Sequence, residues 1–188
     1  MSMTYQERQY LLSLIHLGAD TSDCVMPLYQ TALDLRAERI IELGVREGVS
    51  TRALLLAAKQ LEAHLWSVDL DPCISAAQLV DSWHLTQNWT FIRSDSREFL
   101  RSWRGAPVDM VFIDSGHSYE LTLEELELGV RRLWPWGVIL LHDTKDPNYP
   151  GVLQAIQEFM KSRQDRYRYE ELGPKHGLGK ISPLKEEG

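Results

Sequence analysis

The segment 39–57, RIIELGVREGVSTRALLLA, constrains the fold more than any other part of the sequence. A short apolar run is followed by Gly44 and Gly48, and then by a second apolar run. Glycine allows a sharp turn because it has no Cβ. The pattern therefore predicts a buried strand, a tight turn and a helix that begins at Ser50 or Thr51.

The start of such a helix is a candidate ligand site. Its first turn presents unpaired N–H groups and a partial positive charge, and nucleotide-type ligands bind at strand–turn–helix units of this kind. An ordinary connection between a strand and a helix also uses glycine, so the segment alone leaves both interpretations open.

Composition limits the classes of protein to consider. A chain of 188 residues predicts one domain over 1–188, with N-terminal helices in 1–38 and an α/β core in 39–184. The formal net charge of -7 argues against nucleic-acid binding, which needs a basic surface. Two cysteines form no disulfide framework. With no signal segment or long apolar run, we expect a cytoplasmic protein without membrane contact.

Apolar periodicity predicts the remaining elements. Strands are expected in the opening segment and at 64–68, 90–92, 108–113, 138–141, 166–172 and 178–182. Helices are expected at 4–17, 28–36, 50–63, 75–83, 96–103, 120–133 and 152–161, with a loop at 20–26. Repeated βα units predict a three-layer αβα, doubly wound fold with a mostly parallel sheet.

Polar residues collect where the predicted strands end. They are Glu42, Asp69, Asp95, Asp114, His142 and Asp143. Ligands bind at this edge of open parallel sheets. Asp69 lies 25 residues after Gly44 and can accept both hydroxyls of a ribose. The alternative is an Asx turn before Pro72, a role that we assign to Asp71.

At these positions the sequence resembles the class I S-adenosylmethionine-dependent methyltransferases. It is most similar to the small O-methyltransferase-like branch, which carries IDGxHxY after the fourth strand and HD after the fifth. The corresponding segments here are FIDSGHSYELTLEELE and GVILLHDT, and the resemblance covers 40–144. It implies a Rossmann-like, seven-stranded sheet whose last strand is antiparallel.

The sequence departs from this branch at two places. Ser115 replaces the commoner glycine of IDG, and Trp136 stands where Pro-Gly-Gly is usual. Pro135 to Gly137 are therefore predicted to form a turn of another type, with Trp134 and Trp136 near the surface. A homodimer through this region or through the N-terminal helices is a further expectation.

The resemblance also implies S-adenosylmethionine as the cofactor. Glu42 and Gly44 would line its methionine end, Asp69 would hold the ribose, and Asp95 with Ser96 would lie beside the adenine. Independently of this, Ser96 is predicted to cap the helix at 96–103. The cofactor site is completed by Gly48, Ser50 and Asp114.

Two mechanisms can activate an acceptor hydroxyl. A divalent metal, Mg²⁺ or another, can be held by Asp114, His142 and Asp143, since the fourth and fifth strands should be neighbours. Thr144 follows where metal-dependent relatives carry asparagine. Alternatively, His117 or His142 acts as general base near Asp114 without a metal.

The sequence thus predicts methylation of a hydroxyl on a small molecule, such as a sugar, a phenol or a secondary metabolite. A non-catalytic adenosyl-cofactor-binding protein is the alternative. A nicotinamide-dependent oxidoreductase is less favoured because the G-x-G-x-x-G motif is missing. The acidic helix at 120–133 is expected to expose a solvated face formed by Glu120, Glu124, Glu125 and Glu127.

Overall fold

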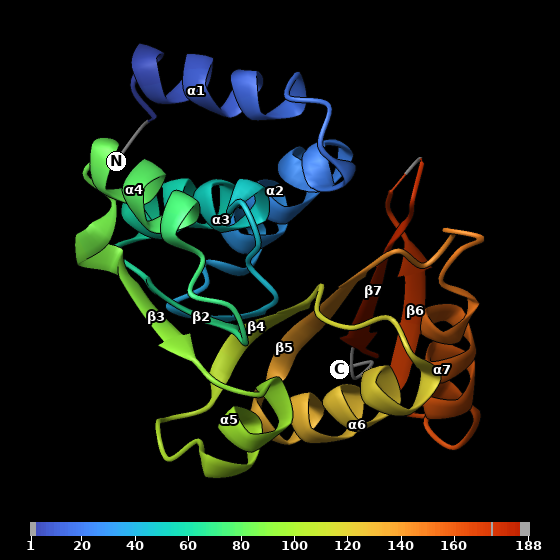
Figure 1. Ribbon diagram of the computed structural model, residues 1–188. Coiled ribbons are helices and arrows are strands. Elements are labelled where there is room, and N and C mark those ends of the chain that lie inside the picture. Colours follow the sequence, from blue (N-terminus) through green and yellow to red (C-terminus); the bar gives the residue numbers. More distant parts are fainter. Residues whose placement is uncertain (1–2, 174, 185–188) are drawn as a thin grey trace.

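A computed structural model describes residues 3–173 and 175–184. Figure 1 shows a central twisted sheet with helices on both sides. The strands are β1 (Arg39–Leu43), β2 (His64–Asp69), β3 (Trp89–Arg93), β4 (Val108–Ile113), β5 (Leu133–His142), β6 (Tyr167–Glu171) and β7 (Leu178–Pro183). The helices are α1 (Tyr5–Ile15), α2 (Val25–Leu35), α3 (Val49–Leu61), α4 (Ile74–Ser82), α5 (Ser96–Ser102), α6 (Tyr119–Gly129) and α7 (Pro150–Lys161).

The sheet has seven strands in the order β3-β2-β1-β4-β5-β7-β6. The first five strands in this order run parallel to one another, and β7 runs antiparallel to both β5 and β6. The predicted doubly wound, mostly parallel sheet is therefore confirmed, including its antiparallel last strand. None of the helices in the described residues is long and apolar enough to cross a membrane.

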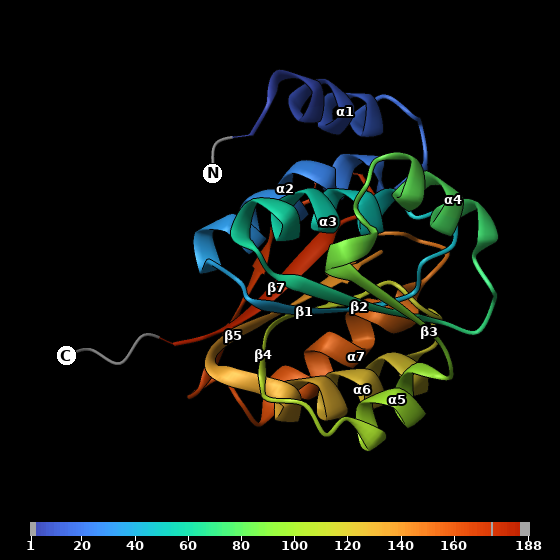
Figure 2. The ribbon, with the colours of Figure 1, turned by 90° about the vertical axis from the view of Figure 1, so that its left-hand side faces the viewer.

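Alternate residues of the central strands enter two separate cores. On β4, Met110 and Phe112 pack with α2 and α3, whereas Val111 and Ile113 pack with α6 and α7. Figure 2 shows α1 to α4 on one face of the sheet and α5 to α7 on the other. A strand buried on both faces needs apolar residues at every position, which explains the continuous apolar runs in the sequence.

The glycine turn has the predicted form. Gly44 has a φ of +94°, and a Cβ there would lie 2.0 Å from the carbonyl oxygen of Asp114. Gly48 has a φ of +73° and immediately precedes α3, which begins at Val49, one residue before the predicted start. The turn thus brings the backbone of β1 directly against the end of β4.

The N-terminal segment contains more helix than predicted. Residues 20–26, expected to be a loop, form a 3₁₀ helix, η1 (Asp20–Cys24), and the first turn of α2. Proline is tolerated in the first turn of a helix because a backbone N–H at that position would have no acceptor within the helix. Pro27 therefore lies inside α2 and does not mark its boundary.

Strand β5 begins earlier than predicted. Pro135, Trp136 and Gly137 were expected to form a turn, but they belong to a bulged part of the strand, because Val108 pairs with Leu133 and Met110 with Val138. The Trp136 indole donates to Asp109 Oδ1 at 3.1 Å, which holds the bulge in place. Trp136 is 54% exposed, so the prediction that it lies near the surface is confirmed.

Candidate functional site

The site lies where the order of the strands reverses, at the carboxyl ends of β1 and β4. The turn at Gly44 and the chain after β4 enclose a pocket of about 230 Å³. Its lining includes Gly44, Asp69, Asp95, Ser96 and Asp114. A smaller recess adjoins it across the Gly44 turn and is lined by Gly48 and Ser50 among others. The structure thus brings together all but one of the residues predicted to bind the cofactor.

Glu42 is the exception, because it lies beneath the turn and is fully buried. Its carboxylate accepts hydrogen bonds from Ser50 at 2.7 Å, Thr51 at 2.8 Å and Ser67 at 2.6 Å. Burial raises the pKa of Glu42 to about 7, in spite of these three donors. Glu42 therefore fixes the start of α3 from below, and its predicted contact with the cofactor stays a prediction.

Asp69 holds the glycine turn from the opposite side. Its Oδ2 accepts the backbone N–H groups of Val45 at 2.8 Å and Arg46 at 3.2 Å, and its Oδ1 accepts that of Asp71 at 2.9 Å. Burial opposes ionisation, but these three donors outweigh it and lower the pKa of Asp69. Asp69 itself, and not Asp71 as predicted, is the acceptor in the Asx turn.

The far wall of the pocket is formed by the start of α5. Asp95, and not Ser96 as predicted, caps this helix by accepting the N–H groups of Arg97 and Glu98. An ion pair with Arg97, together with these bonds, lowers the pKa of Asp95 to about 2. Ser96 instead donates its hydroxyl to Glu125 on α6.

Glu125 was missed by the sequence analysis. It was assigned to a solvated face, but it is fully buried and also accepts the Ser115 hydroxyl at 2.6 Å. That prediction was wrong because α6 packs with this side chain facing α5 and the end of β4. Glu125 thereby connects two residues of the pocket wall, Ser96 and Ser115. The serine in place of the usual glycine at position 115 was the available signal.

Arg46 and Asp20 were also missed. The Arg46 side chain lines both the pocket and the recess, and its Nη1 lies 2.5 Å from Asp20 Oδ2 on η1. Arg46 has a φ of +49°, in the left-handed region, because its N–H must reach Asp69. The N-terminal segment therefore lines the recess and contacts a residue of the pocket wall.

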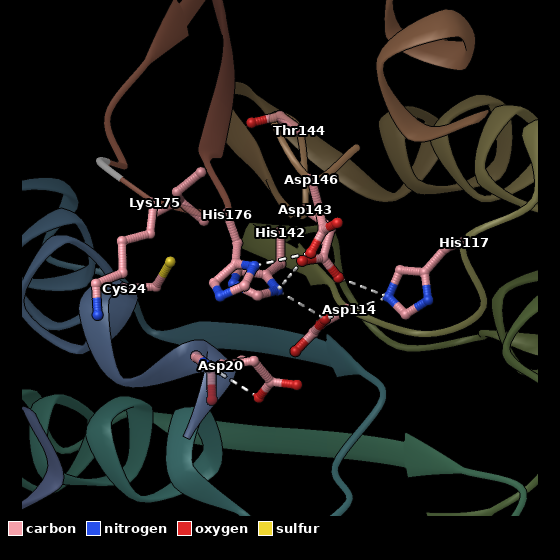
Figure 3. Close-up of polar contacts among 12 residues, drawn as sticks. Asp20, Cys24, Asp114, His117, His142, Asp143, Thr144, Asp146, Lys175 and His176 are labelled. Carbon is pink, nitrogen blue, oxygen red and sulfur yellow. Dashed lines mark hydrogen bonds and ion pairs between the residues drawn. The ribbon is translucent and has the colours of Figure 1, made fainter. Parts of the chain in front are cut away.

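A second group of polar side chains lies beside Asp114, at the ends of β4 and β5 (Figure 3). His142 Nδ1 lies 3.2 Å from an oxygen of Asp114 and 3.2 Å from an oxygen of Asp143. His117 Nε2 lies 2.8 Å from Asp143 Oδ2 and 3.8 Å from Asp114 Oδ1. We call these four residues the carboxylate–histidine cluster. All the predicted catalytic and metal-binding residues belong to it.

The cluster is largely withdrawn from solvent. The His142 side chain is 1% exposed and that of Asp143 is 6% exposed. The carboxylates of Asp114 and Asp143 raise the pKa of His117 to about 9. Burial disfavours a charged His142, but the same two carboxylates outweigh it and raise its pKa as well.

The cluster has the composition of a divalent-cation site. Ligand atoms of Asp114, His117 and Asp143 all lie within 4.8 Å of one another. His117 Nε2 and His142 Nδ1 are buried beside the carboxylates of the cluster, in contacts that do not have hydrogen-bond geometry, and His142 Nε2 is buried with no hydrogen bond to the described residues. Buried polar atoms are almost always paired. These nitrogens therefore fit a role as ligands, and the carboxylates add the oxygen donors that hard cations prefer.

Comparison with known proteins gives one matching family model. Residues 41–144, more than half of the chain, match a family described as "Methyltransferase domain". None of the curated proteins compared with the chain matches it. The matched segment runs from β1 to the end of β5 and so contains the pocket and the cluster.

Solved structures share the fold at low identity. The SAH-bound methyltransferase PaMTH1 of Podospora anserina is 15% identical, with a TM-score of 0.73 over 98% of this chain and 90% of that chain. The O-methyltransferase TomG of Streptomyces achromogenes, in complex with SAM, is 18% identical, with a TM-score of 0.72 over 98% and 92%. A Bacillus cereus O-methyltransferase in complex with SAH is 16% identical, with a TM-score of 0.71 over 98% and 93%.

Proposed function

Because this chain belongs to the methyltransferase-domain family and is a class I S-adenosylmethionine-dependent methyltransferase, we propose that it methylates a hydroxyl oxygen of a small molecule. One observation carries the proposal. Asp114 lines the pocket at the Gly44 turn and also belongs to the carboxylate–histidine cluster. A methyl donor in the pocket and an acceptor hydroxyl at the cluster would therefore both lie beside Asp114.

The residues that line the pocket support an adenosyl cofactor as its ligand. Asp69 and Asp95 contribute two carboxylates to the lining, and Val68, Leu70 and Leu121 supply apolar surface. We infer that Asp69 accepts the ribose hydroxyls, and that Ser96 and Ser115 lie beside the base. The N–H groups at the start of α3 face the recess and suit a carboxylate. The chemistry that the cofactor supplies when bound is an electrophilic sulfonium methyl group.

Methyl transfer to oxygen needs an acceptor that is deprotonated and held in line with the methyl group. We propose that Asp114, His142 and Asp143 hold a divalent cation for this purpose, with His117 as a further ligand at 2.8 Å from Asp143. A cation at such a site lowers the pKa of a hydroxyl that binds to it. Two carboxylates beside buried imidazole nitrogens that make no hydrogen bond of good geometry fit this role.

The metal-free alternative assigns the proton to a histidine. His117 is the more accessible candidate, since its side chain is 26% exposed and stacks on Tyr149 with ring centroids 4.0 Å apart. His142 is too deeply buried for an acceptor to reach it unless the surrounding loops move. Removal of divalent cations with a chelator separates the two mechanisms, because only the first loses turnover and regains it with Mg²⁺ or Mn²⁺.

The first experiment is calorimetric titration of the protein with S-adenosylhomocysteine. We expect saturable binding in the wild type, a loss of at least tenfold in Asp69→Ala, and no comparable loss in Asp71→Ala. Asp71 is a matched control because it is an exposed carboxylate two residues away that does not line the pocket. Absence of binding in the wild type would refute the adenosyl-cofactor site.

A second measurement distinguishes an enzyme from a protein that only binds the cofactor. Asp143→Asn should abolish transfer to hydroxyl acceptors in a screen of phenols, catechols and sugars. It should change the affinity for S-adenosylhomocysteine less than threefold, because Asp143 does not line the pocket. If the wild type binds the cofactor and methylates no hydroxyl acceptor, the proposed oxygen chemistry is wrong. A homodimer, proposed from the sequence alone, is tested by the sedimentation mass.

A further inference from the structure

His142 raises a question that the proposed methyl transfer does not answer. Its side chain is 1% exposed, and neither ring nitrogen has a hydrogen-bond partner among the described residues. Nδ1 lies beside the carboxylates of Asp114 and Asp143, so the carboxylate–histidine cluster accounts for one nitrogen. An imidazole has two nitrogens that can bind a cation, and the cluster leaves Nε2 without a role.

Two residues of η1 also approach the His142 ring. The sulfur of Cys24, a carboxylate oxygen of Asp23 and a ring nitrogen of His142 all lie within 4.8 Å of one another. Figure 3 shows the Cys24 sulfur on the side of the histidine that faces η1. Cys24 is fully buried, and its sulfur lies 3.6 Å from Asp23 Oδ1.

We propose that Asp23, Cys24 and His142 form a second divalent-cation site, which takes Zn²⁺ or a similar borderline-soft ion. Thiolate, imidazole and carboxylate are the three ligand types that Zn²⁺ uses in proteins, whereas a thiolate is a poor ligand for Mg²⁺. Binding displaces two protons: the Cys24 S–H bond breaks as a sulfur–metal bond forms, the protonated His142 ring loses the hydrogen of the nitrogen that binds the ion, and both protons are released to solvent.

The site has support around its ligands. The second oxygen of Asp23 accepts the backbone N–H of Lys175 at 3.2 Å, which orients the carboxylate. Residues around a metal site fix its ligands in this manner. Asp23 and Cys24 precede α2, and His142 ends β5, so an ion there would join the N-terminal segment to the catalytic edge of the sheet. This role does not depend on the proposed methyl transfer.

Cobalt substitution tests the site directly. The purified protein is freed of metal with a chelator and titrated with Co²⁺, which takes the place of Zn²⁺ and gives an intense charge-transfer absorption when a thiolate is bound. We expect this absorption in the wild type and in Cys73→Ser, and its loss in Cys24→Ser. Cys73 is the matched control because it is the only other cysteine in the sequence and does not belong to the cluster.

Two further variants make the outcome decisive. Asp23→Asn should weaken the Co²⁺ affinity measured from this absorption at least tenfold. If Cys24→Ser does not fold, this variant alone tests whether the site exists. Asp143→Asn removes a carboxylate of the other site and should keep the absorption. Co²⁺ binding without the absorption, its persistence in Cys24→Ser, or an unchanged affinity in Asp23→Asn would each overturn the proposal. None of these results alters the S-adenosylhomocysteine titration, so the two proposals can fail separately.

Discussion

At the scale of single residues, Glu42 shows how a buried carboxyl group couples folding to pH. Its pKa rises from 4.5 to about 7 on folding because it is fully buried. The folded protein therefore binds a proton that the unfolded chain releases between these two values. Its contribution to stability is present below pH 4.5 and is lost as the pH rises through 7, a change of about 3 kcal/mol.

Glu42→Gln should remove this dependence, because glutamine stays neutral like the protonated acid. We expect the free energy of unfolding, measured by urea denaturation, to approach that of the wild type at pH 5 and to exceed it at pH 8. Glu38→Gln, at an exposed glutamate beside the same strand, should follow the wild type at both pH values. A constant difference between Glu42→Gln and wild type across this range would contradict the assignment.

Glu125 makes a second prediction at this scale. Its removal leaves the half-buried hydroxyls of Ser96 and Ser115 without their acceptor. A hydrogen bond contributes about 0.5–1.5 kcal/mol, so Glu125→Ala should lower the free energy of unfolding by about 1–3 kcal/mol and weaken S-adenosylhomocysteine binding. Glu120→Ala, at an exposed position of the same helix, is the control. Equal stability of the two variants would show that Glu125 does not hold the pocket wall.

At the scale of elements, the glycine turn depends on close contact between two strands. A Cβ at Gly44 would lie 2.0 Å from the carbonyl oxygen of Asp114, in a backbone conformation with a φ of +94°. Gly18 has a similar φ of +73°, but nothing lies within 4 Å of its Cβ position. Gly44→Ala therefore combines strain with a backbone clash, whereas Gly18→Ala has the strain alone.

We expect Gly18→Ala to lose about 1 kcal/mol of stability, and Gly44→Ala to lose about 3 kcal/mol or more. Chemical denaturation of the two variants side by side measures the difference. Similar losses would mean that the turn relaxes without disturbing β4, and that the contact between β1 and Asp114 is not needed for the fold.

Elements marked by a local sequence pattern were predicted correctly, whereas elements that depend on distant contacts were missed. Strands such as Val108–Ile113 are buried on both faces, so a continuous apolar run marks them without reference to their neighbours. The bulge around Trp136 was missed because it depends on a hydrogen bond to Asp109, 27 residues away. The early start of α2 was missed because a proline in the first turn of a helix reads like a boundary.

The sequence predicted which edge of the sheet the site residues occupy, but it did not predict the burial or the neighbours of their side chains. Polar residues directly after apolar strands must meet at one edge, which predicted the grouping of Asp114, His142 and Asp143. Burial of Glu125 required knowledge of how α6 rotates against α5. The approach of Cys24 to His142 joins segments more than one hundred residues apart, and no local pattern encodes it.

At the scale of the whole molecule, the N-terminal segment forms part of the recess beside the pocket. Helix α1 lies on the outside of the helical layer (Figures 1 and 2). Its Tyr10 stacks on Trp83, with ring centroids 3.5 Å apart. Between α1 and α2, η1 reaches the sheet edge, where Asp20 contacts Arg46 at the pocket and Asp23 contacts Lys175. Residues outside the family-matched segment 41–144 therefore line the recess that adjoins the pocket.

Asp20→Ala tests this dependence. Asp20 and Arg46 are both substantially exposed, with 42% and 63% of their side chains accessible, so the loss of their ion pair should change stability little. Release of S-adenosylhomocysteine should nevertheless become faster, by about threefold to tenfold in a stopped-flow measurement, because Asp20 lines the recess and orders the Arg46 side chain. Asp34→Ala, at a carboxylate on α2 that bonds only to Gln30 on the same helix, is the control. If both variants release the ligand at the wild-type rate, η1 covers the pocket without holding it closed, and entry of the cofactor is governed by the core alone.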